Sequence, residues 1–278
     1  MLQNLTFGFL GGGNMASALI GGLIARGVPA SSIRVVDPFP EALARLQRDL
    51  GVHTAAAPDT AFGASDVLVL AVKPQQFRDA VVQLLPHLPA AGKGNLILSV
   101  AAGIRLQDMQ RWLGGRSRLV RAMPNTPALA GMGMTGLAAP AELDASDRAI
   151  ATAVAEAVGQ CVWVDGDDQI DAVTAISGSG PAYVFYFIEA MEQAATGLGL
   201  TAEQGRKLAV ETFRGAATLA GQSTEAVSTL RERVTSKGGT TYAALTAMAD
   251  AGIGPAFVKA MHAAAARGKE MGEEFGKE

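Results

Sequence analysis

The sequence predicts an α/β domain built around a parallel β-sheet over residues 1–164, followed by an all-helical domain over residues 165–278. The chain has 278 residues, which suits two domains of ordinary size better than one. Up to Val164, short apolar runs alternate with segments of helical periodicity, as in the βαβ units of a parallel sheet. After Val164 the helical period dominates, so we expect helices alone.

The first half begins with a strand at residues 5–10 that ends at a glycine cluster. A helix follows, with Met15, Leu19 and Leu23 at helical spacing and Gly27 as its stop signal. Further apolar runs predict strands at residues 33–36, 67–72, 96–100, 118–123, 134–138 and 161–164. Helical patterns predict helices at residues 41–50, 75–85, 106–113 and about 144–158. The carboxyl ends of parallel strands share one edge of the sheet, where ligands bind.

The second half begins with a charged turn at residues 165–168. Helical periodicity then predicts helices at residues 182–198, 202–219, 225–231, 242–249 and 255–275. These helices are rich in Ala, Met and Gly, which permit close helix packing. We expect this domain to complete its core by pairing with a second copy of the chain.

Composition excludes several classes of protein. Apolar residues make up 49% of the chain and charged residues 18%, which predicts a globular fold. The net charge is −3, without a long run of one sign, so we expect no nucleic-acid partner. Polar residues interrupt each apolar stretch, so we expect no membrane span. The lone cysteine Cys161 excludes an internal disulfide and suits a reducing compartment. Three scattered histidines argue against a metal site. With no membrane span expected either, we expect a cytoplasmic protein.

A glycine motif follows the first strand. Gly11, Gly13 and Ala16 occupy the three small positions of the dinucleotide fingerprint G-x-G-x-x-G/A. Glycines let the backbone approach a pyrophosphate, and the free N–H groups at a helix start attract its negative charge. The alternative is an ordinary glycine turn, but the surrounding strand, helix and later acid favour a Rossmann-type cofactor domain. The expected cofactor contacts here are Leu10, Gly11, Gly12, Gly13, Asn14 and Met15.

Asp37 ends the second predicted strand. An acid at this position hydrogen-bonds the adenine ribose of NAD, and its charge repels the extra phosphate of NADP. The alternative is that Asp37 only begins a turn before Pro38. We expect NADH to be at least tolerated, so the cofactor is NADPH or NADH.

Other strand ends carry further candidate cofactor contacts, namely Ala71, Val72, Lys73, Pro74, Ala101, Ala102, Gly103 and Asn125. Lys73 has two interpretations, since it could cover the cofactor or simply end a strand in solvent. Asn125 lies between Pro124 and Pro127, in a segment that suits a site wall near the nicotinamide or a rigid turn.

The helical half contains two dense glycine and hydroxyl blocks. Residues 177–181 read Ser-Gly-Ser-Gly-Pro and precede a helix. Residues 234–241 contain two glycines and four hydroxyl side chains, and they also run into a helix. Capping alone needs only one Ser or Thr, so the second block predicts a site for a carboxylate or phosphate. No metal-ligand spacing, Cys-His pair or carboxylate pair is evident, so the chemistry is expected to reside in the cofactor.

Together these blocks resemble the pyrroline-5-carboxylate reductase family along nearly the whole chain. The resemblance is carried by residues 8–16, 71–74, 101–103, 123–127, 177–183 and 234–241. It implies a Rossmann domain followed by a helical dimerisation domain, with dimers that often assemble into decamers. It also implies hydride transfer from NAD(P)H to the C=N carbon of 1-pyrroline-5-carboxylate, giving L-proline.

The resemblance further implies roles for the block at residues 234–241. Ser236 and the backbone of Gly238, Gly239 and Thr240 would hold the substrate carboxylate. Thr241 would be the catalytic residue and would hydrogen-bond the ring nitrogen.

Several positions depart from the family pattern. Lys237 and Val227 stand where the family often has proline, and a common asparagine is replaced near Pro58 and Asp59. Glu225 is one position displaced from a family acid, so no role is transferred to it. NADP-preferring members often have a small hydroxyl residue where Asp37 stands.

Two rival interpretations remain. A reductase related to 3-hydroxyacid dehydrogenases would use a lysine of the helical domain, but Lys207 and Lys259 lie outside any glycine and hydroxyl block. A non-catalytic nucleotide sensor would have no need for the block at residues 236–241.

Overall fold

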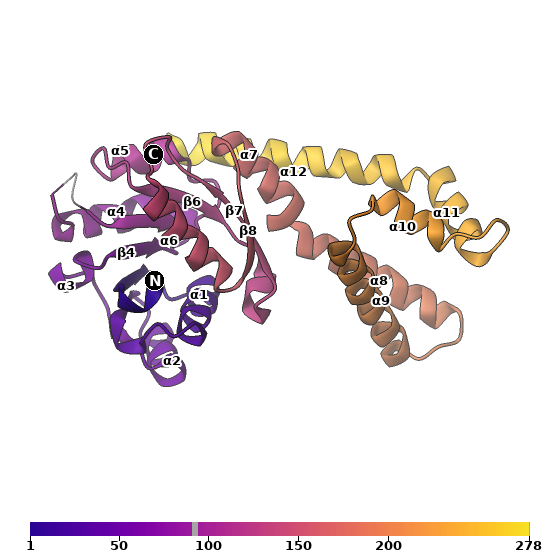
Figure 1. The fold of residues 1–278 in the computed structure, drawn as a ribbon, viewed down its shortest axis with the longest axis horizontal. Coiled ribbons are helices and arrows are strands. Elements are labelled where there is room, and N and C mark those ends of the chain that lie inside the picture. The colour runs from indigo at the N-terminus through magenta and orange to yellow at the C-terminus, as the bar shows by residue number, and fades with distance from the viewer. Residues whose placement is uncertain (91–93, 278) are drawn as a thin grey trace. The chain divides into compact units, whose positions relative to one another are not determined.

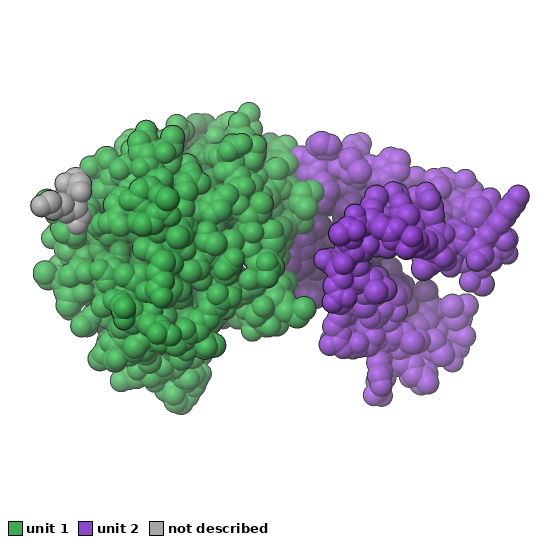
Figure 2. Space-filling view, viewed as in Figure 1, with its two compact units in different colours: residues 1–179, 264–278 green, residues 180–263 purple. Residues whose placement is uncertain are grey.

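The structure is a computed structural model and describes residues 1–90 and 94–277 (Figure 1). Its contacts define two compact units, shown in different colours in Figure 2. The sheet unit comprises residues 1–179 and 264–278, and the helical unit comprises residues 180–263. The division therefore falls after the expected boundary at residue 164, and the end of the last helix belongs to the sheet unit.

The sheet unit contains eight strands in the order β3-β2-β1-β4-β5-β6-β7-β8. All neighbouring strands are parallel except β6 and β7, which run antiparallel. The strands are β1 Phe7–Leu10, β2 Ile33–Val36, β3 His53–Ala55, β4 Val67–Leu70, β5 Leu96–Ser99, β6 Leu119–Met123, β7 Gly133–Ala138 and β8 Gly159–Trp163. The order of the first six strands is that of a Rossmann sheet, which confirms the predicted fold class.

Helices cover both faces of this sheet (Figure 1). They are α1 Asn14–Ala25, α2 Pro40–Leu50, α3 Thr60–Gly63, α4 Phe77–Leu84, α5 Leu106–Trp112, α6 Ala145–Glu156 and α7 Gly166–Val173. Short 3-10 turns lie at Leu2–Asn4, Ala30–Ser32, Pro74–Gln76, Leu85–His87 and Thr126–Ala130, and a π-helical turn lies at Thr174–Gly178.

The central strands are apolar on both sides because each side is buried. In β4, Val67 and Val69 join the apolar cluster beneath α1 and α6, whereas Leu68 and Leu70 join the cluster beneath α4 and α5. Successive side chains of a strand point to opposite faces, so an uninterrupted apolar run is what a doubly covered parallel strand requires.

The structure corrects one expectation and adds elements that the sequence pattern did not predict. The charged turn expected at residues 165–168 is the start of α7, because Asp167 forms an ion pair with Arg121 on the sheet. Strand β3 and helix α3 were not predicted, since both are too short to show a period.

The helical unit confirms the expected all-helical second half. It contains α8 Gly180–Gly197, α9 Ala202–Gln222, α10 Val227–Arg233, α11 Thr240–Asp250 and the first part of α12 Ile253–Gly276. Helices α8 and α9 pack together, and Gly205 lies against Ala195. A capping box of Thr201 and Gln204 begins α9. Among the helices that the structure describes, none combines the length and the apolar character that a membrane span requires.

Candidate active site

The glycine turn between β1 and α1 forms the first part of the site. Gly11 has a φ of +103°, and a Cβ atom there would lie 2.7 Å from the carbonyl oxygen of Ala71. A Cβ atom at Gly12 would lie 2.9 Å from the Leu46 side chain, whereas at Gly13 no described atom lies within 4 Å. The first two glycines therefore allow close packing within the protein, and Gly13 leaves its outer side open to a ligand.

Gly13 is also the N-cap of α1, and among the described residues no side chain caps this helix. The N–H groups of the first turn therefore face the open side of the glycine turn without a capping carboxylate or hydroxyl. Such a helix start binds phosphate, because its N–H groups and dipole both favour negative charge. Asn14 and Met15, two of the predicted cofactor contacts, form the start of this helix.

Asp37 lies beside the glycine turn, as the sequence predicted. Its side chain is buried, and its Oδ2 atom accepts the N–H of Gly12 at 2.7 Å. Its Oδ1 atom accepts the N–H of Phe39 at 2.8 Å. The carboxylate is thus fixed between the glycine turn and the start of α2, at the carboxyl end of β2.

Arg45 of α2 also holds the glycine turn, a role that was not predicted from the sequence. Its guanidinium Nη2 donates to the carbonyl oxygen of Gly12 at 3.1 Å and to the Ser17 hydroxyl at 3.4 Å. The Gly12 residue is therefore held at its N–H by Asp37 and at its C=O by Arg45. No sequence pattern predicts this contact, because an arginine in an amphipathic helix usually faces solvent.

The ends of β4 and β5 bring the next candidates to the same edge of the sheet. Ala71 continues from β4, and its N–H donates to the carbonyl of Leu10 at 2.8 Å. Lys73 is exposed at the turn that follows. Ala101 is buried and Ala102 is partly exposed beyond β5.

Gly103 has a packing role at the end of this segment. It is buried with a φ of +75°, and a Cβ atom there would lie 3.0 Å from the ring of Phe275 in α12. Close contact with α12 thus explains why glycine stands here. Its predicted contact with the cofactor stays a prediction.

Asn125 joins three segments of the sheet unit. Its Oδ1 atom accepts the N–H of Met134 at 2.9 Å, at the start of β7. Its Nδ2 atom donates to the carbonyl and hydroxyl oxygens of Ser177, both at 3.2 Å. The Asn125 side chain therefore fixes the segment after β6 against the π-helical turn, and its expected role in holding the cofactor stays a prediction.

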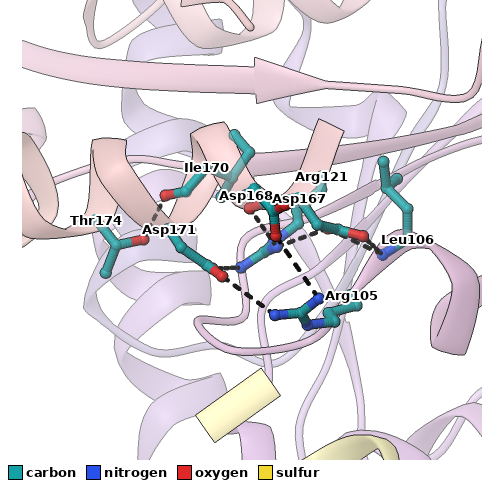
Figure 3. A network of polar contacts seen from close by, with 8 residues as sticks. All are labelled: Arg105, Leu106, Arg121, Asp167, Asp168, Ile170, Asp171 and Thr174. Atoms are coloured by element: carbon teal, nitrogen blue, oxygen red, sulfur yellow. Dashed lines mark hydrogen bonds and ion pairs between the residues drawn. The ribbon is translucent and has the colours of Figure 1, made fainter. Parts of the chain in front are cut away.

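A buried ion network lies next to these segments and was not predicted from the sequence (Figure 3). Arg121 of β6 pairs with Asp167 at 2.6 Å and with Asp171 at 3.0 Å, both on α7. Arg105 pairs with the second carboxylate oxygen of Asp171 at 3.3 Å. The only sequence signal was an arginine inside an otherwise apolar strand.

The block at residues 236–241 forms a tight turn that begins α11 in the helical unit. Gly238 has a φ of +73°, and the N–H of Gly239 donates to the carbonyl of Ser236 at 3.0 Å. Gly239 is the N-cap of α11, and no described side chain caps this helix. Ser236 and Thr240 are exposed, and Thr241 is partly buried. The structure therefore gathers the predicted substrate-binding residues around one uncapped helix start, which suits a carboxylate.

Two positions near this block have local partners. The Thr235 hydroxyl donates to the carbonyl of Arg231 at 2.6 Å, so one of the four hydroxyl side chains completes α10. Glu225, to which no role was transferred, pairs with Arg233 at 2.6 Å.

The described residues offer little for metal or thiol chemistry. Residues 1–90 and 94–277 contain no group of three His, Cys, Asp or Glu side chains that could hold a metal ion. Burial, with a smaller effect from Glu156, raises the pKa of the Cys161 thiol, which lowers its reactivity near neutral pH.

Comparisons with known proteins match both halves of the chain. The family model described as pyrroline-5-carboxylate reductase dimerisation matches residues 167–271, and the model described as NADP oxidoreductase, coenzyme F420-dependent, matches residues 6–103. A pyrroline-5-carboxylate reductase of Pseudomonas aeruginosa is 43% identical over 96% of this chain and 97% of its own length. The Vibrio alginolyticus enzyme of that name is 40% identical over 99% of this chain and 100% of its own length.

Solved structures give the same result. A pyrroline-5-carboxylate reductase from Coxiella burnetii matches with a TM-score of 0.90 and 39% identity, over 96% of this chain and 98% of that one. The Plasmodium falciparum enzyme, solved with NADP bound, matches with a TM-score of 0.85 and 25% identity, over 98% of this chain and 100% of that one. These matches extend over nearly the full length of the chain, and they agree with its fold, its glycine turn and its helix start at residues 236–241. The chain therefore belongs to the pyrroline-5-carboxylate reductase family.

Proposed function

We propose that this protein reduces 1-pyrroline-5-carboxylate to L-proline with NADPH or NADH. The observation that carries the proposal is the turn at residues 236–241, where an uncapped helix start is surrounded by hydroxyl side chains. A cyclic imine that bears a carboxylate needs an anion site of this size. The membership of the family and the second uncapped helix start, at Gly13, support the same reaction.

The glycine turn fits a dinucleotide. The open side of Gly13 and the uncapped N–H groups of α1 suit a pyrophosphate, and Asp37 suits the ribose hydroxyls of the adenosine half. The further cofactor contacts in the proposal are Ala71, Val72, Lys73, Pro74, Ala101, Ala102, Gly103 and Asn125. When bound, the reduced nicotinamide supplies the hydride.

The helical unit would hold the substrate. In this proposal Ser236 and the backbone N–H groups of Gly238, Gly239 and Thr240 bind the carboxylate, and the dipole of α11 adds to their attraction. Lys237 is exposed on the same turn and adds a positive charge near the anion. The Thr241 hydroxyl hydrogen-bonds the ring nitrogen and fixes its position.

The reaction balances without a further co-reactant. The hydride adds to the C=N carbon, the π electrons of that bond pass to nitrogen, and a proton from solvent completes the secondary amine. If the imine arrives protonated, the chain needs no strong acid and only has to hold the imine in place. Holding the reactants in the correct geometry can supply much of the acceleration.

We also propose that the protein forms a homo-oligomer and that it is located in the cytoplasm. The exposed apolar side chains of the helical unit support a homodimer formed through that unit. A decamer of such dimers is the larger assembly in this proposal. We place the protein in the cytoplasm, which suits its lone cysteine, and we assign it no nucleic-acid partner because it carries no concentrated basic charge.

The test is a reductase assay with purified protein. Loss of the reduced-nicotinamide absorbance on addition of 1-pyrroline-5-carboxylate, with proline identified by mass spectrometry, is the expected result. Each cofactor is assayed alone, and cofactor binding is measured by fluorescence in the absence of substrate. Folded protein that binds NAD(P)H without oxidising it would contradict the proposed substrate, and binding of neither cofactor would contradict the cofactor site.

A further inference from the structure

We infer that Arg121 and Asp167 are positioning residues for the segment Ala101–Gly103, and that they set the affinity for the cofactor through it. The inference rests on the proposed function, in which this segment contacts NAD(P)H. Neither side chain needs to touch the cofactor or the substrate. Both act through the backbone that follows β5.

The network connects one arginine to two carboxylates one helical turn apart. Arg121 is 2% exposed and uses its Nη1 atom for Asp167 and its Nη2 atom for Asp171. Asp167 and Asp171 stand four residues apart on α7, so both face the sheet. Figure 3 shows both carboxylates converging on the guanidinium of Arg121.

The same carboxylates hold the residues that follow Gly103. Both oxygens of Asp167 accept the backbone N–H of Leu106, at 3.1 and 3.2 Å. Asp171 receives the guanidinium of Arg105 at 3.3 Å. The segment is also fixed at its start, where the N–H of Val100 donates to the carbonyl of Leu70 at 3.0 Å. The backbone between Val100 and Leu106 is therefore held at both ends, by the sheet and by the ion network.

Glycines of α12 bring this helix close to the network. A Cβ atom at Gly272 would lie 2.5 Å from Nε of Arg105, and a Cβ atom at Gly268 would lie 3.7 Å from Asp171. The side chain of Phe275 on the same helix covers Gly103. Close packing of α12 shields the network from water, which strengthens its ion pairs and fixes their geometry.

The chemistry of the network favours a positioning role over a stabilising one. Buried ion pairs add little net stability, because the cost of removing charges from water offsets their attraction. Apolar side chains of similar size would hold α7 on the sheet equally well. The carboxylate of Asp167 also accepts the N–H of Leu106, which an apolar side chain could not do, so the network determines where the backbone after β5 lies.

The chain offers a matched control in a second ion pair of the same sheet unit. Arg118 pairs with Asp147 at 2.6 Å, and the Asp147 side chain is 1% exposed. Arg118 lies just before β6, at the end of that strand opposite the carboxyl edge. Loss of Asp147 therefore removes a buried partner without touching the segment after β5.

The experiment compares Asp167→Ala with Asp147→Ala in the full chain. We expect Asp167→Ala to raise the KM for NADPH about tenfold, and to weaken NADPH binding by a similar factor in fluorescence titrations, with a smaller effect on kcat. A tenfold change corresponds to about 1.4 kcal/mol, which is within the range of one lost charge-assisted hydrogen bond. Asp147→Ala should lower the melting temperature and leave the KM for NADPH unchanged.

A conservative variant separates positioning from folding. Asp167→Asn keeps an oxygen that can accept the N–H of Leu106 and loses the charge that pairs with Arg121, so an intermediate KM is expected. An unchanged KM in both Asp167 variants, or an equal rise in Asp147→Ala, would overturn the inference. If Asp167→Ala does not fold, Asp167→Asn decides by the same measurement. Failure of the wild-type protein to reduce 1-pyrroline-5-carboxylate would instead contradict the proposed function, so the two failures are distinct.

Discussion

Asp37 holds the glycine turn, and the proposed function gives it a second task in choosing between the two cofactors. Both of its carboxylate oxygens accept backbone N–H groups, from Gly12 and Phe39, so the side chain helps to hold the glycine turn. Its negative charge lies at the carboxyl end of β2, where in the proposed function it acts on the ribose substituent. A change at Asp37 should therefore lower the affinity for both cofactors and alter the preference between them.

Asp37→Ser is the variant that reveals both effects. We expect the ratio of kcat/KM for NADPH to that for NADH to rise by roughly tenfold, equivalent to about 1.4 kcal/mol, because the charge that repels the extra phosphate is lost. Steady-state kinetics with each cofactor measure this ratio. Asp49→Ser removes an exposed carboxylate at the far end of α2 and serves as the control. An unchanged ratio in Asp37→Ser would show that Asp37 only shapes the turn.

Thr241 is the residue to which we assign contact with the substrate nitrogen. Thr241→Ala should lower kcat by roughly 10- to 100-fold, as expected for the loss of a hydrogen bond to a charged group. Cofactor affinity, measured by fluorescence titration, should change by less than twofold. Thr241→Ser keeps the hydroxyl and should restore most of the activity. Full turnover in Thr241→Ala would remove this side chain from the mechanism.

At the scale of elements, the turn after β5 depends on close contact with α12. Gly103 combines a positive φ with a packed environment, so an alanine there meets both backbone strain and the ring of Phe275. Gly114 has a similar φ of +71°, but no described atom lies within 4 Å of its would-be Cβ. Comparing alanine substitutions at Gly103 and Gly114 therefore separates the cost of backbone strain from the cost of the packing clash.

Gly103→Ala should therefore destabilise the protein more than Gly114→Ala does. Left-handed strain in a non-glycine residue costs on the order of 1–3 kcal/mol, and overpacking adds about 1–3 kcal/mol. Urea unfolding of both variants gives the two free energies, and their difference reports the contact with α12. Equal values would mean that Phe275 moves aside without cost.

The elements also show which parts of this fold a sequence can predict. The glycine turn, the parallel strands and the helix at α11 follow local rules of period, capping and glycine conformation, and they were predicted. The charges at the start of α7 predict a turn, because the partner that stabilises them in a helix is far away in the sequence. Arg121 lies 46 residues from Asp167 and 50 residues from Asp171. The contacts of Asn125 with Met134 and Ser177 likewise join distant segments. Such tertiary pairings leave no periodic signal, so neither the ion network nor the packing of α12 could be predicted.

On the scale of the whole molecule, the helical unit has too little buried apolar surface to form a core alone. In the described part of that unit, Ala209 is the only buried apolar side chain among residues 180–263. Eight large apolar side chains of this unit are more than half exposed, namely Phe185, Tyr186, Leu198, Leu208, Leu219, Val227, Val234 and Val258. A monomer rarely exposes so much apolar surface, so we expect a second copy of this unit to bury it in a dimer interface.

Leu208→Glu tests whether the dimer interface includes Leu208 of α9. Leu208 is 56% exposed and lines a hollow of about 580 Å³ together with Leu200, Gln204, Lys207, Glu211 and Thr212. Burying a carboxylate in an apolar interface costs several kcal/mol of desolvation, so we expect dimer dissociation to become at least a hundredfold more favourable. Val82→Glu is the control, because Val82 is 58% exposed on α4 of the sheet unit. Sedimentation velocity over a range of concentrations should show monomers for Leu208→Glu and wild-type assembly for Val82→Glu. If both variants assemble like the wild type, Leu208 lies outside the interface, and the second copy must pack on other exposed apolar side chains of the helical unit.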